Sequence, residues 1–567
     1  MPNKRHQSDC TQSAVSLLTG AALLLPGLGY NAVFAAEDDE VDFQYSHYQE
    51  GERGSINTLD TNPETGAIFQ APVPNKRNPI EVDSLHGSGR FSLTDRIKFA
   101  FNYIQDTWSG ATPYGTAPEF SGANRVRKIT DVEGNDVYAG ASPFIIAREY
   151  FDKQGNAFHQ IFDTATLKNV YLKSRPVHVM GFASPETRKQ GDFKLSYDWD
   201  DAGIEAGGGI STESDYESRF VNLGGRMDFN QKRTTVSGGV SYTNSAINVV
   251  LDSLGDDFFR WGPQHEGLIQ NNTLTGINIL NANREDWAGH LELTQIVNQN
   301  ALVQVGASYT RSTGFLENPY KLSWIFGLDP ELESDGYILG SAHDGVFMEQ
   351  RPDAHDQWHW NAGWTQFIEP FNAALHFKYS FNHDDWGINA HTFDADWVQP
   401  LAYGWTVTPH IRYYSQSAAY FYEPYSFTNS KIEGSTETWP FVLPENFSSD
   451  QRLSGFGALS GGVSIEKKFA KGLSLVAGFE YYTHQGGLKL GGGGEQDFAD
   501  FDYWVANAAL KVNLSSIGQG LAYKTDGHVA HHDHPNIPAG VLFGHTLNKA
   551  GDMMAGYRYM HSQQAGA

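Results

Sequence analysis

Apolar and polar residues alternate along several stretches of this chain for about ten residues or more. The pattern runs through Phe371–Asn382, Trp405–Tyr414, Thr234–Thr243, Ala301–Thr310, Leu473–Tyr482 and Asp502–Leu514. Side chains alternate faces along a β-strand, so a period of two predicts strands with one apolar and one polar face. The stretches are about twice as long as ordinary strands, and a tilted strand of that length crosses a bilayer.

The alternation also assigns side chains to the two faces of the predicted sheet. The face expected to meet lipid carries Phe371, Leu375, Phe377, Trp405, Ile411 and Phe479. The opposite face carries Lys378, Arg412 and Glu480. Only a closed sheet satisfies every backbone polar group in lipid. The chain is therefore predicted to be all-β, a closed antiparallel transmembrane β-barrel of roughly 14–18 strands with long outer loops.

The chain divides into three predicted parts. Residues 1–36 combine Lys4 and Arg5 with an apolar run and end in Ala35-Ala36, which is typical of a secretory signal peptide. Residues 37–514 are predicted to form the barrel, with 50–90 as a Pro- and Gly-containing loop and with long loops at 109–190, 251–287, 315–355 and 423–450. Residues 515–567 form a His/Met-rich C-terminal tail. The expected location is the bacterial outer membrane.

Composition excludes several classes of function. Aromatic residues make up 13% of the chain and charged residues only 19%, as expected where strands face lipid and aromatic girdles mark its boundaries. The net charge of −26 disfavours nucleic acid as a partner. Cys10, the single cysteine, lies within the predicted signal peptide, which excludes disulfides and thiol catalysis in the mature chain. No Walker, Gly-x-Ser-x-Gly or His-Glu-x-x-His motif occurs, so we expect no enzyme.

Four segments resemble a bacterial family of outer-membrane β-barrel proteins of unknown function. They are Asp106–Gly115 (DTWSGATPYG), Asn318–Lys321 (NPYK), Asp385–Ile388 (DWGI) and Arg412–Tyr422 (RYYSQSAAYFY), the last being the most specific. The resemblance covers roughly residues 40–514. One position departs from it, because Tyr420 stands where the family pattern has Asp. The resemblance implies fold and location but supplies no substrate.

The C-terminal tail holds the strongest candidates for metal-binding residues. Its candidate metal ligands are His528, His531, His532, His534, His545, Met553 and Met560. Imidazole suits copper and zinc, whereas thioether selects Cu(I). The segment Gly544–Met560 also resembles a recurring segment of outer-membrane proteins found near copper handling. The alternative interpretation is a solvated polar tail without metal, so the only cofactor suggested is Cu or Zn.

Opposite charges are predicted to meet on the polar face of three successive strands. The residues expected to line the lumen are His376, Lys378, Asp394, Asp396, His410, Arg412 and Glu480. Neighbouring strands lie about 5 Å apart, so these side chains can form a ladder. The ladder is either a charged lining that screens solutes or a salt-bridge network that pairs the polar side chains of the wall. The salt-bridge network is favoured, because balanced charges cancel most of their field.

Two functions remain open after this survey. The first is a pore or transport-related barrel, whose partners are lipid and a small solute or metal ion. The second is a non-conducting anchor or scaffold barrel for a periplasmic metal or redox partner protein. Conductance in a planar bilayer separates them.

Overall fold

The structure is a computed structural model that describes most of the chain between residues 40 and 513 and one segment near its C-terminus. The described residues are 40–49, 56–61, 68–73, 80–119, 127–130, 136–139, 148–163, 167–251, 259–272, 277–341, 346–429, 444–470, 473–496, 500–513 and 554–566. They contain no α-helix, only short 3₁₀ helices: η3 (Pro263–His265), η4 (Glu369–Phe371), η5 (Ala402–Gly404), η6 (Gln451–Leu453) and η7 (Gly486–Leu488). None of the helices in these ranges is long and apolar enough to cross a membrane.

Most strands belong to one 18-stranded sheet, which we call the wall. In spatial order its strands are β1 (Glu40–Gln49), β4 (Glu81–Ser92), β5 (Ile97–Pro118), β11 (Pro176–Asp198), β12 (Ala202–Thr212), β13 (Tyr216–Phe229), β14 (Thr234–Leu251), β17 (Ile277–Asn298), β18 (Ala301–Gly314), β22 (Ala354–Ile368), β23 (Ala373–Asp384), β24 (Asn389–Pro400), β25 (Trp405–Gln416), β27 (Phe456–Ala470), β28 (Leu473–Gln485), β29 (Phe501–Asn513) and β30 (Met554–Gly566). Each strand pairs antiparallel with the next, and the short β16 (Ile269–Asn272) also pairs with β17.

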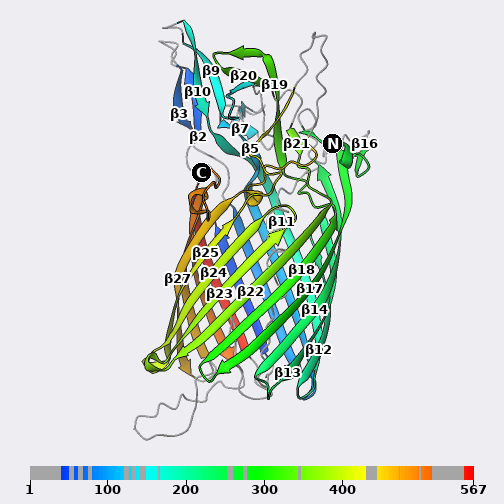
Figure 1. Cartoon of the computed structure of the whole chain (residues 1–567), viewed down its shortest axis with the longest axis vertical. Helices are drawn as coiled ribbons and strands as arrows, with labels where there is room; N and C mark the ends of the chain where they lie inside the picture. Colours follow the sequence, from blue (N-terminus) through cyan, green and yellow to red (C-terminus); the bar gives the residue numbers. More distant parts are fainter. Residues whose placement is uncertain are drawn as a thin grey trace, which may run out of the picture.

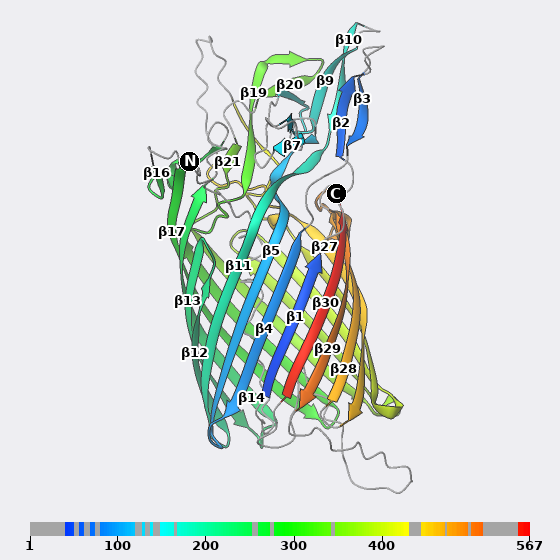
Figure 2. The same ribbon diagram turned by 180° about the vertical axis from the view of Figure 1, so that it is seen from behind.

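The wall strands are inclined to the long axis of the molecule and run side by side around it (Figure 1). β1 and β30, the two ends of this series, lie next to each other (Figure 2). Adjacent strands are joined at one end by short turns, for example Ile368 to Ala373 and Pro400 to Trp405. Asn372 adopts a left-handed conformation in the first of these turns, which Asn tolerates better than most residues. The long connections that carry the described strands β8 to β10, β19 to β21 and β26 lie at the other end (Figure 1).

One face of the wall carries large apolar side chains that none of the described residues covers. All six residues predicted to meet lipid are exposed: Phe371, Leu375, Phe377, Trp405, Ile411 and Phe479. Five of them lie in strands and alternate there with polar residues, as in β23, where the exposed Phe377 precedes Lys378; Phe371 lies in η4, just before β23. The wall therefore has one apolar and one polar face, as the sequence pattern predicts.

The long connections form a second, 8-stranded sheet above the wall. It comprises β8 (Arg148–Phe151), β9 (Ala157–Asp163), β10 (Lys168–Ser174), β15 (Phe259–Arg260), β19 (Leu322–Ser334), β20 (Tyr337–Ser341), β21 (Val346–Met348) and β26 (Ser426–Asn429). Two small hairpins, β2 (Ile56–Thr61) with β3 (Ile68–Val73) and β6 (Arg127–Thr130) with β7 (Asp136–Ala139), complete the strands. We call the 8-stranded sheet and the segments that join it to the wall the loop layer.

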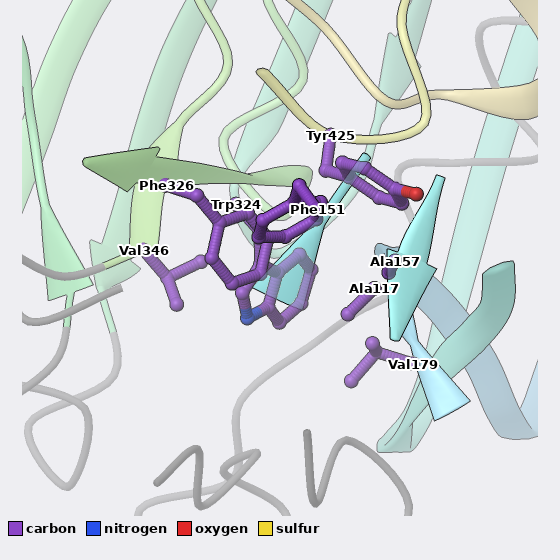
Figure 3. Packing of buried hydrophobic residues seen from close by; sticks show 8 residues of the cluster. All are labelled: Ala117, Phe151, Ala157, Val179, Trp324, Phe326, Val346 and Tyr425. Atoms are coloured by element: carbon purple, nitrogen blue, oxygen red, sulfur yellow. The ribbon is translucent and has the colours of Figure 1, made fainter. Parts of the chain in front are cut away.

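The loop layer has its own apolar core, which attaches it to the wall. Phe151 packs against Phe326 and Tyr425, with ring centroids 5.0 and 5.9 Å apart. Ala117 of β5 and Val179 of β11 are part of the same buried cluster (Figure 3). Because β5 and β11 run up from the wall, the cluster joins the two sheets in one packed unit.

The structure differs from the sequence expectations in several places. The segments predicted as long loops contain the strands of the 8-stranded sheet, and the wall strands β11 and β17 begin inside two of them, at Pro176 and Ile277. Within the predicted loop at 50–90, Glu81–Ser92 forms the wall strand β4. Within the predicted tail, Met554–Gly566 forms β30 and pairs with β29 along its whole length. The sheet thus continues past the boundary predicted at residue 514, because the end of the tail alternates well enough to pair. The predicted signal peptide, residues 1–36, lies outside the described residues.

Candidate functional site

The charged residues predicted on the polar face do meet across the strands. His376 pairs in register with Asp396, and its Nδ1 lies 2.7 Å from an Asp396 carboxylate oxygen. His410 Nε2 lies 3.5 Å from Glu480, two strands away. The Arg412 Nε lies 3.7 Å from Asp394. The structure thus brings together the ladder expected from the sequence.

The charges of this ladder are unevenly shared. Asp394 stands directly opposite Lys378 on one side and opposite Arg412 on the other. Two permanent cations therefore share one carboxylate, whereas Asp396 and Glu480 each have a histidine partner. Among His376, His410 and Arg412, Arg412 lies farthest from its carboxylate partner, and its side chain is 56% exposed.

Six rings lie on the polar face beside Arg412 and between it and the loop layer. We call them the aromatic cluster: Tyr414, Phe456, Tyr482, His484, Phe501 and Tyr503. Tyr414 and Phe456 have ring centroids 5.6 Å apart, and Phe456 lies 4.0 Å from the His484 ring. Sequence analysis assigned several of these residues to strands but did not single out the cluster. The sequence feature that indicates the cluster is the presence of aromatic residues at polar-face positions of neighbouring strands.

A separate group of charges is buried inside the loop layer. We call Lys321, Glu349, Arg351, Asp450 and Arg452 the ion network. Asp450 lies 2.9 Å from Arg351, 2.6 Å from Arg452 and 3.6 Å from Lys321. The side chains of Lys321, Glu349 and Asp450 are at most 1% exposed. Charges so deeply buried must be paired, since an isolated one costs several kcal/mol.

Hydrogen bonds tie the ion network to three chain segments. Lys321 Nζ donates to the Pro113 carbonyl oxygen at 2.9 Å, which connects it to β5. Glu349 accepts from the Asn318 backbone N–H at 2.6 Å and from the Ser448 hydroxyl at 2.5 Å. The network therefore fixes the connections around β19, β21 and β27 against the upper end of β5.

Burial and neighbouring charges shift the ionisation of this network in opposite directions. Burial lowers the pKa of Lys321 to about 8, against the opposing effect of Asp450. Burial alone would raise the pKa of Asp450, but Arg452, Lys321 and Arg351 together hold it well below its ordinary value. The Asp450 carboxylate is thus charged at neutral pH, and the three neighbouring cations stabilise its charge.

The four segments of the family resemblance converge on this network. Lys321 joins the NPYK segment to Pro113 of the first segment. Arg351 lies 5.8 Å from the ring centroid of Trp386, which packs edge-on against Phe421 at 5.2 Å. Tyr420, the departing residue, is exposed, and its hydroxyl accepts from Asn446. The residues that carry the resemblance therefore organise the loop layer, rather than the lower part of the wall.

All but one of the predicted metal ligands lie outside the described residues. His528, His531, His532, His534, His545 and Met553 fall outside the described residues, while Met560 lies in β30 opposite Asn507. In the described ranges, no three His, Cys, Asp or Glu side chains form a group that could hold a metal ion. Metal binding by the tail stays a prediction.

The fold and the sequence together define the class of this protein. In its described residues it is an all-β protein of mostly antiparallel strands, and it belongs to the DUF3570 family of proteins of unknown function, which it matches over residues 15–505. The family resemblance seen in the four segments is confirmed. No curated protein matches the chain.

Several solved outer-membrane proteins are similar in structure at low sequence identity. A ferric enterobactin receptor (PfeA) mutant from Pseudomonas aeruginosa is 9% identical, with a TM-score of 0.38, and the match covers 84% of this chain and 60% of the receptor. The ferric-catecholate import receptor Fiu from E. coli is 11% identical, with a TM-score of 0.34 and coverages of 84% and 75%. The chain thus spans less than two thirds of the length of the first of these proteins.

Proposed function

We propose that the chain is a closed β-barrel of the bacterial outer membrane that passes a small solute through its lumen. The observation that carries the proposal is the band of exposed apolar side chains on one face of the wall. A soluble protein rarely exposes so large an apolar surface, whereas lipid covers it at no cost. The proximity of β1 and β30 supports closure, which places the polar face and its ladder inside.

A transport role follows from the character of the enclosed face. Arg412, Lys378 and Glu480 are all exposed or partly exposed there, so the lumen is lined by charge. Charged linings attract or reject ions and small polar solutes. We propose no catalysis, because neither the sequence motifs nor the ladder provides a nucleophile with its base.

Conductance in a planar lipid bilayer tests this function. The purified mature protein is expected to produce discrete current steps, and Arg412→Glu is expected to shift the reversal potential in a KCl gradient toward cation selectivity. Arg311→Glu makes the same change of charge on β18, where Arg311 lies on the apolar face with Tyr309 and pairs with Asp356, and it should leave the reversal potential unchanged. A protein that inserts but carries no current contradicts the pore.

The second candidate is an anchor or scaffold barrel without a conducting lumen. The observation in its favour is the ion network, which holds the connections of the loop layer rigidly at one end of the wall. Insertion without current would favour this candidate, and a pull-down from periplasmic extract with the mature protein would then identify the partner.

We further propose that the tail binds Cu or Zn, through His528, His531, His532 and His534 with His545, Met553 and Met560 in support. Neutral imidazole is the ligand, so uptake should weaken as the pH falls through about 6.5. Isothermal titration of the full mature chain with Cu(II) or Zn(II) measures it. Replacing the four histidines of 528–534 by Ala should abolish micromolar binding, whereas His383→Ala on the wall should not; equal binding by both variants would contradict the proposal.

A further inference from the structure

The aromatic cluster lies on the face of the wall where rings are least expected. Aromatic girdles of membrane barrels face lipid. Tyr481 is exposed on the apolar face, and Tyr413 stands on the same face opposite the exposed Leu459. Tyr414 and Tyr482, one residue further along the same strands, point to the opposite face together with Arg412 and Glu480. The cluster therefore belongs to the polar side of the wall.

Register places Arg412 in one row with two of these rings. Arg412 stands opposite Ser460, Ser460 opposite Tyr482, and Tyr482 opposite Tyr503. Ser460 is 3% exposed, because larger neighbours cover it. Arg412 also lies close enough to Tyr414, Tyr482 and Tyr503 to interact electrostatically with all three. A guanidinium group and a set of aromatic rings thus share one small area.

Packing within the wall explains why the rings lie together, but it does not explain why Arg412 lies beside them. Tyr482 stacks on Tyr503 with centroids 4.6 Å apart, and each such pair stabilises the wall modestly. Arg412, however, lies 3.7 Å from Asp394, beyond the ~2.7–2.9 Å of a charge-assisted hydrogen bond. Asp394 also stands opposite Lys378, so Arg412 shares this carboxylate with a second cation, and the Arg412 side chain stays 56% exposed.

We propose that Arg412 and the aromatic cluster form a binding site for planar aromatic anions, such as aromatic carboxylates, in the lumen. This inference rests on the proposed function, since it takes the polar face as the solute path. The guanidinium group binds the carboxylate in its bidentate fork. The rings of Tyr482 and Tyr503 offer an apolar surface to the solute ring. Charge and ring are recognised together, so a solute with only one of them binds more weakly.

The binding test uses three probes that separate charge from aromaticity. Isothermal titration of the full mature protein in detergent compares 4-hydroxybenzoate with cyclohexanecarboxylate, which keeps the charge, and with phenol, which keeps the ring. We expect 4-hydroxybenzoate to bind about tenfold more tightly than either. Equal affinities for 4-hydroxybenzoate and cyclohexanecarboxylate would overturn the role of the rings, and no binding would overturn the site.

Matched variants assign the binding to these residues. Arg412→Gln should weaken 4-hydroxybenzoate binding about tenfold, because the charged partner is lost. Tyr482→Leu should weaken it about fivefold, whereas Tyr481→Leu, the next residue on the opposite face, should leave it unchanged. If Tyr482→Leu and Tyr481→Leu have the same effect, the assignment is wrong.

Bilayer currents distinguish failure of this site from failure of the pore. With an active pore and an intact site, 4-hydroxybenzoate should reduce the current at concentrations where cyclohexanecarboxylate does not. Current without discrimination between the two probes refutes the site and leaves the pore standing. Calorimetric binding without any current refutes the pore and retains the site.

Discussion

Asp450→Asn is expected to destabilise the loop layer by about 3–5 kcal/mol, the cost of breaking a buried ion pair while its partners stay buried. Asp450 is wholly buried and is the acid that Lys321, Arg351 and Arg452 share. The amide has nearly the same shape, so no cavity forms and the loss is electrostatic. Hydrogen exchange of the backbone amides in β19 measures the local free energy of opening.

An exposed pair provides the control for this prediction. Lys194 and Glu205 lie 2.8 Å apart on the wall, and both side chains are about one third exposed. Glu205→Gln should change stability by about 1 kcal/mol or less, as surface ion pairs do. The double variant Lys321→Met/Asp450→Leu should recover part of the lost stability, because Lys321 no longer stays buried without its acid and Arg351 keeps Glu349, 2.8 Å away. If Asp450→Asn costs no more than Glu205→Gln, the ion network does not hold the loop layer.

The sign of the acid dependence follows from the lowered pKa of Asp450. Arg452, Lys321 and Arg351 hold that pKa well below its ordinary value despite burial. A carboxyl whose folded pKa lies below its unfolded one stabilises the fold above the unfolded value, about 3.9, and loses this contribution as the pH falls through the folded value. The loop layer should therefore keep this contribution at pH 5, and Asp450→Asn should have the same effect at pH 5 and pH 7.

Sequence reasoning predicted the wall where its strands alternate strictly and missed it where they do not. Phe371–Asn382 and Trp405–Tyr414 each show a clean period of two, and they form β23 and β25 apart from Phe371 and Asn372, which lie in the preceding turn. Most of β4 lies in a Pro- and Gly-containing stretch that predicts a loop, and one of its faces carries Leu85, Gly87 and Gly89 with little apolar area. Without apolar side chains on one face, a strand has no periodic signal even when its neighbours pair with it.

The ladder and the ion network show how far sequence distance limits such predictions. His376, Asp396 and His410 lie on consecutive strands, where a short turn sets the register and the partners can be counted. Lys321 and Gln451 are 130 residues apart, yet their side chains are hydrogen-bonded. Short strands of the loop layer carry no long period, so only the folded chain brings such residues together.

Phe377→Arg is expected to destabilise the membrane-embedded protein by about 2–4 kcal/mol, the cost of a cation at a lipid-facing site near the middle of the bilayer. Phe377 lies within β23, between Trp364 and Ala395 of the neighbouring strands, and its ring is exposed. On the proposed barrel its only surroundings are acyl chains, which offer the guanidinium group neither water nor an acid. Urea unfolding in lipid vesicles, followed by tryptophan fluorescence, measures the loss.

Two further arginine substitutions on β23 test which face of the strand meets lipid and how deep Phe377 lies in the bilayer. Ser380→Arg lies three residues further along β23 on the polar face, so its side chain reaches water in the lumen and should cost far less. Leu375→Arg faces lipid but lies closer to the turn at Asn372, where the side chain can extend to the interface, so its cost should fall between the two. Equal losses for Phe377→Arg and Ser380→Arg would show that the two faces of β23 meet the same medium, and a larger loss for Leu375→Arg than for Phe377→Arg would move the centre of the bilayer toward the short turns.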